Sequence, residues 1–168
     1  MSFRELDELA EKIAPGSDGL TMLPYFTGST MPKYNPDARA SFSGLTLSHT
    51  RAHFARAIME STAFTLKQNL EYVGDEGIEE IRITGGGASS PLWANIKANV
   101  TGKVLKTLSE SETACLGTAI LAAVGVGEYA SVSEAAGAVV KTKGEYNPTG
   151  DDYSNAYEKY VKMDNLLN

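Results

Sequence analysis

The sequence has 168 residues, a size typical of one domain, and 42% of its residues are hydrophobic. The net charge of −6, with 15 scattered Lys and Arg residues, argues against a nucleic-acid surface, because phosphate contacts need clustered cations. One cysteine, Cys115, excludes an internal disulfide and a cysteine-rich metal site, and we find neither a secretory leader pattern nor a long apolar run. We therefore expect a cytoplasmic protein that binds neither nucleic acid nor membrane.

The first part of the chain predicts two helices, two strands and a long loop. In chain order these are a helix over 3–14, a strand over 19–25, a loop over 26–39, a strand over 40–45 and a helix over 46–73. Pro15-Gly16 would end the first helix, and Ser48 is the predicted N-cap of the second. The loop is rich in Gly, Pro and Asn, and its length is typical of a functional or interfacial segment.

The second part predicts strands and helices in alternation. In order these are a strand over 78–84, a helix over 91–100, a strand over 104–108, a helix over 113–126, a short helix over 131–139, an extended segment over 140–146 and a helix over 151–167. Ser109 and Glu112 have the spacing of a capping box, and we favour this role for Glu112 over a functional one. The helix over 113–126 is so rich in Ala and Gly that we expect it to lie against another backbone. The alternation predicts an α/β layer with mostly parallel strands and right-handed crossovers.

A triple-glycine turn, Thr84-Gly85-Gly86-Gly87-Ala88, follows the strand over 78–84 and precedes the helix that begins at Pro91. Glycine allows backbone angles and close approaches that a Cβ would block. Pro91 suits the first helical position, with Ser90 or Ser89 as the N-cap. A strand, a glycine turn and a capped helix N-terminus together present free N–H groups, where nucleotides often bind. Taken alone, the motif is equally typical of a turn that only reverses the chain.

Three pieces of the sequence occur in the order found in one enzyme family. They are Phe26-Thr27-Gly28 followed by Pro32, Pro36, Ala38-Arg39 and Gly44-Leu45; then Thr84-Gly85-Gly86-Gly87-Ala88; then Glu112-Thr113-Ala114-Cys115-Leu116-Gly117-Thr118-Ala119. The stretch over 40–60, with Phe42, His53, Phe54 and Ala57, adds a fourth piece. In this order they resemble the C-terminal part of the FGGY carbohydrate kinases, and within that family the xylulose kinase branch.

The resemblance implies an α/β domain of the actin-like ATPase (ribonuclease H-like) class, a mixed sheet with flanking helices that is incomplete at its N-terminal end. Residues 1–168 would form one domain, the C-terminal nucleotide-binding portion of a sugar kinase whose N-terminal sugar-binding domain is absent. The implied function is to bind ATP for phosphorylation of a sugar hydroxyl, in D-xylulose by the closest resemblance. ATP and Mg would be held mainly by parts of the parent enzyme that this chain lacks.

The same resemblance places an adenosine site on the glycine turn. Gly85, Gly86, Gly87 and Ala88 would let the base and ribose lie against the backbone. Ser90 stands where relatives place a side chain that contacts adenine. No catalytic residue and no metal ligand is implied for this chain, so we expect it to be inactive by itself.

Two departures from the xylulose kinase pattern keep other substrates open. Ser29-Thr30 follows Gly28 where many xylulose kinases have Glu-Arg, and Ala40 stands where glycine is usual. A glycerol or gluconate kinase of the same family is therefore an alternative. A different class of alternative is a non-catalytic interaction module, with the helices over 113–126 and 151–167 as a subunit interface. We expect a homodimer, with nucleotide and sugar as small-molecule partners.

Other motifs carry less weight. Residues 125–130 fit a dinucleotide-binding fingerprint as a string, but they follow a predicted helix rather than a strand. His49 and His53 have a spacing that can bind metal on a helix, but nothing completes the site, so we expect packed or solvated histidines. Trp93 and the tyrosines of the last helix are expected in the core or at an interface.

Overall fold

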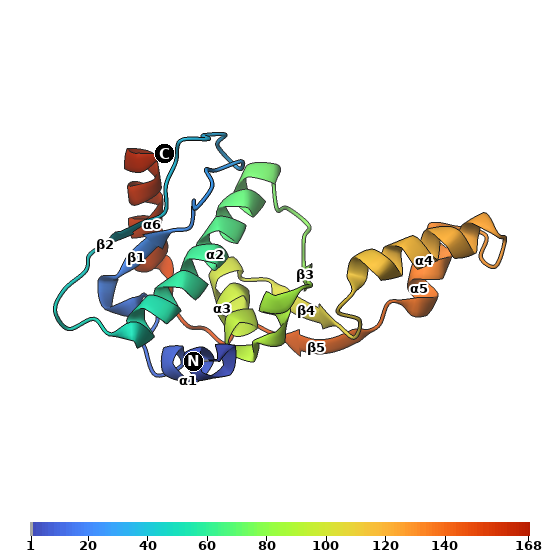
Figure 1. The fold of residues 1–168 in the computed structure, drawn as a ribbon, viewed down its shortest axis with the longest axis horizontal. Coiled ribbons are helices and arrows are strands. Elements are labelled where there is room, and N and C mark those ends of the chain that lie inside the picture. The colour runs from blue at the N-terminus through green and yellow to red at the C-terminus, as the bar shows by residue number, and fades with distance from the viewer. Residues whose placement is uncertain (1) are drawn as a thin grey trace.

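The structure is a computed structural model that describes residues 2–168 (Figure 1). Its α-helices are α1 (Phe3–Ala10), α2 (Arg51–Val73), α3 (Pro91–Thr101), α4 (Thr113–Gly125), α5 (Val132–Val139) and α6 (Ser154–Leu167). Its strands are β1 (Thr21–Leu23), β2 (Ser41–Ser43), β3 (Glu80–Ile83), β4 (Val104–Leu108) and β5 (Thr142–Tyr146), and its short 3-10 turns are η1 (Ser17–Gly19) and η2 (Gly86–Ser89). None of the helices within residues 2–168 has the length and apolar character needed to cross a bilayer.

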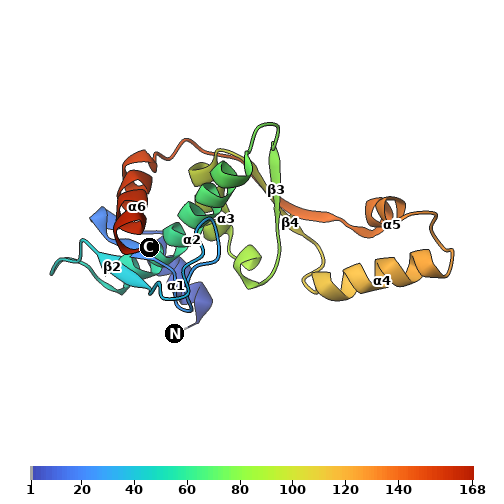
Figure 2. The same ribbon diagram turned by 90° about the horizontal axis from the view of Figure 1, so that it is seen from above.

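The strands form two small sheets. β1 and β2 pair antiparallel, and the second sheet has the order β3-β4-β5. β3 and β4 are parallel, with Ile81 opposite Leu105, whereas β4 and β5 are antiparallel, with Leu105 opposite Tyr146. The mixed sheet implied by the family resemblance is confirmed, and the expectation of mostly parallel strands is wrong. The reason is that α4 leads the chain away from the sheet and α5 leads it back (Figure 2). The first residue of β5, Thr142, therefore lies beside the last residue of β4, Leu108, and the two strands run in opposite directions.

The hydrophobic core lies where α2, α3 and α6 meet. Phe64 of α2, Ile96 of α3 and Tyr160 of α6 are all buried in it. The phenyl ring of Phe64 lies 5.4 Å from the Tyr160 ring and 6.3 Å from that of Tyr153, measured between ring centroids. Tyr153 and Tyr160 therefore confirm the expectation that tyrosines near the C-terminus belong to the core.

Several predicted helix ends are confirmed by their capping contacts. The Ser90 hydroxyl accepts a hydrogen bond from the Trp93 N–H at 3.1 Å, and Pro91 occupies the first position of α3. Gly102 ends α3 with a left-handed φ of 67°. Ser131 caps α5 by accepting a hydrogen bond from the Glu134 N–H.

Other predicted ends are wrong. α1 ends at Ala10 rather than at residue 14. The N-cap of α2 is Thr50 rather than Ser48, because His53 accepts a hydrogen bond from the Thr50 N–H at 3.1 Å and closes the first turn there. α6 begins at Ser154, three residues later than the predicted start at 151.

The capping box predicted before α4 is also not formed. Glu112 is the N-cap residue, but its side chain makes no capping hydrogen bond. The Ser109 hydroxyl instead donates to the carbonyl of Lys141, the residue directly before β5, at 3.2 Å. A tertiary contact between two segments has replaced the local contact that the spacing favoured.

α4 and α5 form a helical hairpin that extends away from the rest of the molecule (Figures 1 and 2). Ile120 of α4 and Ala135 of α5 are buried, but Leu121 is 62% exposed and Val126, at the C-cap of α4, 84%. The small residues Ala114, Ala119 and Ala122 are likewise exposed. The expectation that this helix lies against another backbone is confirmed where it packs on α5, but these three small residues are exposed.

A buried carboxylate joins α6 to the opposite side of the core. Asp164 is 0% exposed and contacts four side chains, those of Tyr25, Gln68, Asn168 and Lys33. Burial by itself would raise the pKa of the Asp164 carboxyl. The three hydrogen bonds, with the Lys33 charge 3.6 Å away, outweigh burial and lower that pKa below its usual value of 3.8.

Because the folded-state pKa of Asp164 lies below its unfolded value, its contribution to stability is present above pH 3.8 and is lost as the pH falls through the folded pKa. We expect Asp164→Asn to lower the free energy of unfolding at neutral pH by about 1–3 kcal/mol. The difference between variant and wild type should shrink in acid, as measured by urea denaturation at a series of pH values. Parallel pH profiles for the two proteins would contradict this role.

Candidate functional site

The glycine turn follows β3 directly and is built from local contacts. Gly85 has φ of 78° and ψ of −170°, a backbone conformation that only glycine adopts readily. The Ala88 N–H donates to the Gly85 carbonyl at 3.0 Å, which closes the 3-10 turn η2. The predicted sequence of strand, glycine turn and capped helix is confirmed.

The turn lies at the edge of the sheet where ligands commonly bind. β3 and β4 are parallel, so the segment after Ile83 and the segment after Leu108 leave the sheet at the same edge. In α/β proteins, ligands bind outside the carboxyl ends of parallel strands. The two segments that the family resemblance singled out, Thr84–Ala88 and Glu112–Ala119, follow these two strand ends.

A groove of about 1160 Å³ opens beside the turn. Its lining residues come from α1, from the N-terminal half of α2, and from the turn together with the start of α3. Of the five residues predicted to bind adenosine, Gly86, Gly87 and Ser90 line the groove. Gly85 and Ala88 belong to the same turn but do not line it.

The opposite wall of the groove was not predicted. It includes Phe3 and Leu6 of α1 with Phe54 and Ile58 of α2. The sequence pattern placed Phe54 and Ile58 on the apolar face of a helix, yet Ile58 is 40% exposed. The signal for a binding wall is an apolar side chain that packing leaves exposed. A sequence pattern shows which residues are apolar, but it does not show which of them are exposed.

The groove is chemically suited to a flat, largely apolar group. Its walls are mainly apolar, and Arg4, Asp7 and Arg51 supply the charged side chains. A Cβ built on Gly86 would meet no atom within 4 Å, so there is open space above the turn. The Ser90 hydroxyl already accepts a hydrogen bond and leaves its own O–H able to donate. A purine ring and a hydrogen-bond acceptor on it would fit these features.

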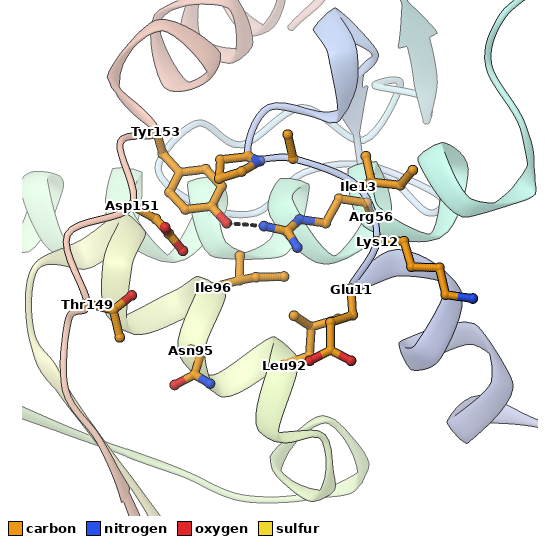
Figure 3. Close-up of a pocket in the computed structure, with 12 residues that line it drawn as sticks. Glu11, Lys12, Ile13, Arg56, Leu92, Asn95, Ile96, Thr149, Asp151 and Tyr153 are labelled. Atoms are coloured by element: carbon orange, nitrogen blue, oxygen red, sulfur yellow. Dashed lines mark hydrogen bonds between the residues drawn. The ribbon is translucent and has the colours of Figure 1, made fainter.

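A second cavity, of about 430 Å³, lies between the segment after α1, the N-terminal part of α2, α3 and the segment before α6 (Figure 3). The Arg56 guanidinium points into it and donates to the Tyr153 hydroxyl. Glu11 and Asp151 place carboxylates at the same cavity. Because none of the lining residues belongs to the glycine turn and the cavity is smaller than the groove, it is less suited to a nucleoside than the groove is.

The histidines behave as packed side chains. The His53 Nε2 lies 3.0 Å from the Asp18 carboxylate, and its Nδ1 accepts a hydrogen bond from the Thr50 N–H. The His49 ring meets the His53 ring edge-to-face, with centroids 5.1 Å apart. Within residues 2–168, no group of three or more His, Cys, Asp and Glu side chains is arranged to hold a metal ion.

Comparison with known proteins gives a consistent set of relatives. Xylulose kinase from Haemophilus influenzae is 36% identical over 168 residues, which cover 96% of this chain and 34% of that protein. Gluconokinase from Bacillus subtilis is 30% identical over 168 residues, covering 96% of this chain and 33% of that protein. Glycerol kinases also match. The chain thus spans about a third of the length of these relatives.

The fold and a family model agree with these relatives. The crystal structure of ligand-bound xylulose kinase from Lactobacillus acidophilus matches with a TM-score of 0.88 and 26% identity, covering 99% of this chain and 35% of that chain. The model of the C-terminal domain of the FGGY family of carbohydrate kinases matches residues 3–126, which include the groove and the glycine turn. The chain therefore belongs to the FGGY family of carbohydrate kinases, as a C-terminal domain with the actin-like ATPase fold of these enzymes.

Proposed function

We propose that this chain is the nucleotide-binding part of an ATP-dependent carbohydrate kinase and that adenosine lies in the groove against the glycine turn. The observation that carries the proposal is the open apolar groove at the carboxyl end of β3, lined by Gly86, Gly87 and Ser90. The apolar walls would hold the base, and the Ser90 O–H would donate to it. The open space above Gly86 would admit a ring that a side chain would exclude.

In phosphoryl transfer a protein acts mainly by positioning the reacting groups and stabilising their charge. ATP, with magnesium, supplies the phosphoryl group that is transferred. The residues of this chain would bind and orient the nucleoside end of ATP. We propose that the sugar site and the general base lie in the remaining two thirds of a full-length kinase, so the chain alone should transfer no phosphate. We also propose a cytoplasmic location, where Cys115 would stay reduced.

D-xylulose is the proposed sugar, because a xylulose kinase combines high identity with coverage of nearly all of this chain. Gluconate is the runner-up, because a gluconokinase matches over the same length at lower identity. A full-length kinase that carries this domain should be tested with xylulose, gluconate and glycerol at saturating MgATP. A kcat/KM highest for gluconate or glycerol would reject xylulose and leave the kinase assignment intact.

The binding proposal is tested by calorimetric titration of the chain with MgADP and, separately, with ribose 5-phosphate and magnesium. We expect weak binding of MgADP and none of the sugar phosphate, because the groove is suited to the base rather than to the phosphates. Equal heats from both ligands would place the contact on the ribose and phosphates rather than on the base. Absence of any binding would remove the support for an adenosine site in this chain.

We also propose, as a second candidate function, that the hairpin of α4 and α5 is a self-association surface. The observation in its favour is that Leu121 and Val126 are largely exposed at the end of the molecule remote from the groove. Exposed apolar residues clustered on one projecting element are typical of protein interfaces. A homodimer formed there would leave the groove free.

Leu121→Glu is expected to convert a dimeric chain into a monomer. Burying a leucine side chain stabilises an interface by about 1.5–3 kcal/mol, and a buried unpaired carboxylate would add a penalty. Sedimentation velocity over a range of protein concentrations measures the effect. Thr118→Glu places the same charge on an exposed polar position of α4 and is the matched control. A wild-type chain that stays monomeric throughout would contradict self-association.

A further inference from the structure

Trp93 lies between the glycine turn and α2. Its indole N–H donates to the Met59 carbonyl at 3.0 Å and to the Thr62 hydroxyl at 2.8 Å. Both acceptors belong to α2, a helix of 23 residues with a largely buried N-terminal half. The orientation of the indole is therefore fixed by the core of the molecule rather than by the turn.

The opposite edge of the same ring supports the turn. A Cβ built on Gly87 would lie 3.2 Å from Cζ3 and 3.4 Å from Cε3 of Trp93. A Cβ on Gly85 or Gly86 would meet no atom within 4 Å. Of the three glycines, Gly87 is therefore the one that lies against the body of the molecule, and the side chain it lies against is Trp93.

Lys97 completes this cluster. Its Nζ lies 4.5 Å from the centroid of the Trp93 ring and 3.6 Å from the position of a Cβ on Gly87. Burial lowers the pKa of the Lys97 ammonium. The cation on the ring face and the two hydrogen bonds at the N–H leave the indole little freedom to turn.

We propose that Trp93 is a positioning residue that holds the Gly85–Ser90 turn in place by joining Gly87 to α2. This inference rests on the proposed function where it concerns nucleotide affinity. The claim that Trp93 holds the turn in place can be tested without a nucleotide. Loss of the indole N–H should let the turn move while the rest of α3 stays folded. The nucleotide affinity should then fall, because the turn would have to be ordered on binding.

The test uses Trp93→Phe, which keeps an aromatic ring but removes the N–H donor. We expect hydrogen exchange of the amides in residues 84–90 to become at least about tenfold faster, because the variant loses both hydrogen bonds of the indole N–H and the loss of one of typical strength already accounts for about tenfold. The matched control is Val100→Ala, which removes buried side-chain atoms at the other end of α3 without contacting the turn. Thr62→Val removes only one of the two acceptors of the indole N–H, so it should accelerate exchange in the turn by a smaller factor. If Trp93→Phe does not fold, this variant provides the test.

Titration of each protein with MgADP separates this inference from the proposed function. Weaker binding by Trp93→Phe than by Val100→Ala, with faster exchange in the turn, supports both. Faster exchange in the turn without binding by any protein, wild type included, supports the positioning role and rejects the nucleotide site. Unchanged exchange in the turn, or equal acceleration by Val100→Ala, overturns the positioning role whatever the binding result.

Discussion

Gly86→Val is expected to lower the affinity of this chain for MgADP by roughly a hundredfold while its thermal unfolding stays the same. Gly86 lines the groove, and a Cβ added there would meet no atom within 4 Å. Its φ is not in the left-handed region, so valine can adopt the same backbone conformation. The two methyl groups would occupy the space proposed for the base and would leave the turn folded.

Gly125→Val is the matched control for this experiment. Gly125 likewise has no atom within 4 Å of an added Cβ and no left-handed φ, and it lies at the end of α4, remote from the groove. We expect this variant to bind MgADP as the wild type does in calorimetric titration. Unchanged binding by Gly86→Val would place the nucleotide elsewhere, and a large fall in its melting temperature would show that the turn itself had been disrupted.

Arg56→Met is expected to lower the free energy of unfolding by about 3–5 kcal/mol, the largest stability effect we predict. The Arg56 Nε donates to the Glu60 carboxylate at 2.9 Å, and both side chains are no more than 5% exposed. The same carboxylate accepts hydrogen bonds from the Gly16 N–H and the Ser17 hydroxyl. Burial nevertheless raises the pKa of Glu60, which shows how costly its charge is in the core. Removal of the guanidinium would leave that charge buried without its cation.

Urea denaturation measures this effect, with two further variants as references. Arg82→Met breaks an ion pair with Glu80 whose arginine is 59% exposed, so it should cost less than about 1 kcal/mol. The double variant Arg56→Met with Glu60→Leu removes both charges and should recover much of the lost stability. Equal losses for Arg56→Met and Arg82→Met would show that the buried pair contributes no more than a surface pair.

The features of this fold that follow from short-range contacts were predictable from the sequence. Ser90 caps α3, Pro91 begins it and Gly102 ends it, because each of these roles depends on a residue and its neighbours within one helical turn. Thr50 replaced Ser48 as the cap of α2, and Ser109 bonded Lys141 instead of closing a capping box. In both cases a distant segment takes part: the His53 ring that accepts from the Thr50 N–H also contacts Asp18, and the partner of Ser109 is Lys141.

The sequence by itself determined the glycine turn, the capped helix that follows it and the family to which the motifs belong. Only the tertiary structure decided that β5 is antiparallel, because the direction of a strand depends on the path of the α4 and α5 hairpin before it. Likewise, only packing brought Phe54 of α2 and Phe3 of α1 to the groove, and only packing set Trp93 between Gly87 and α2. A local motif fixes the conformation of a turn, but the walls of a binding site come from segments that are distant in the chain and meet only when the core forms.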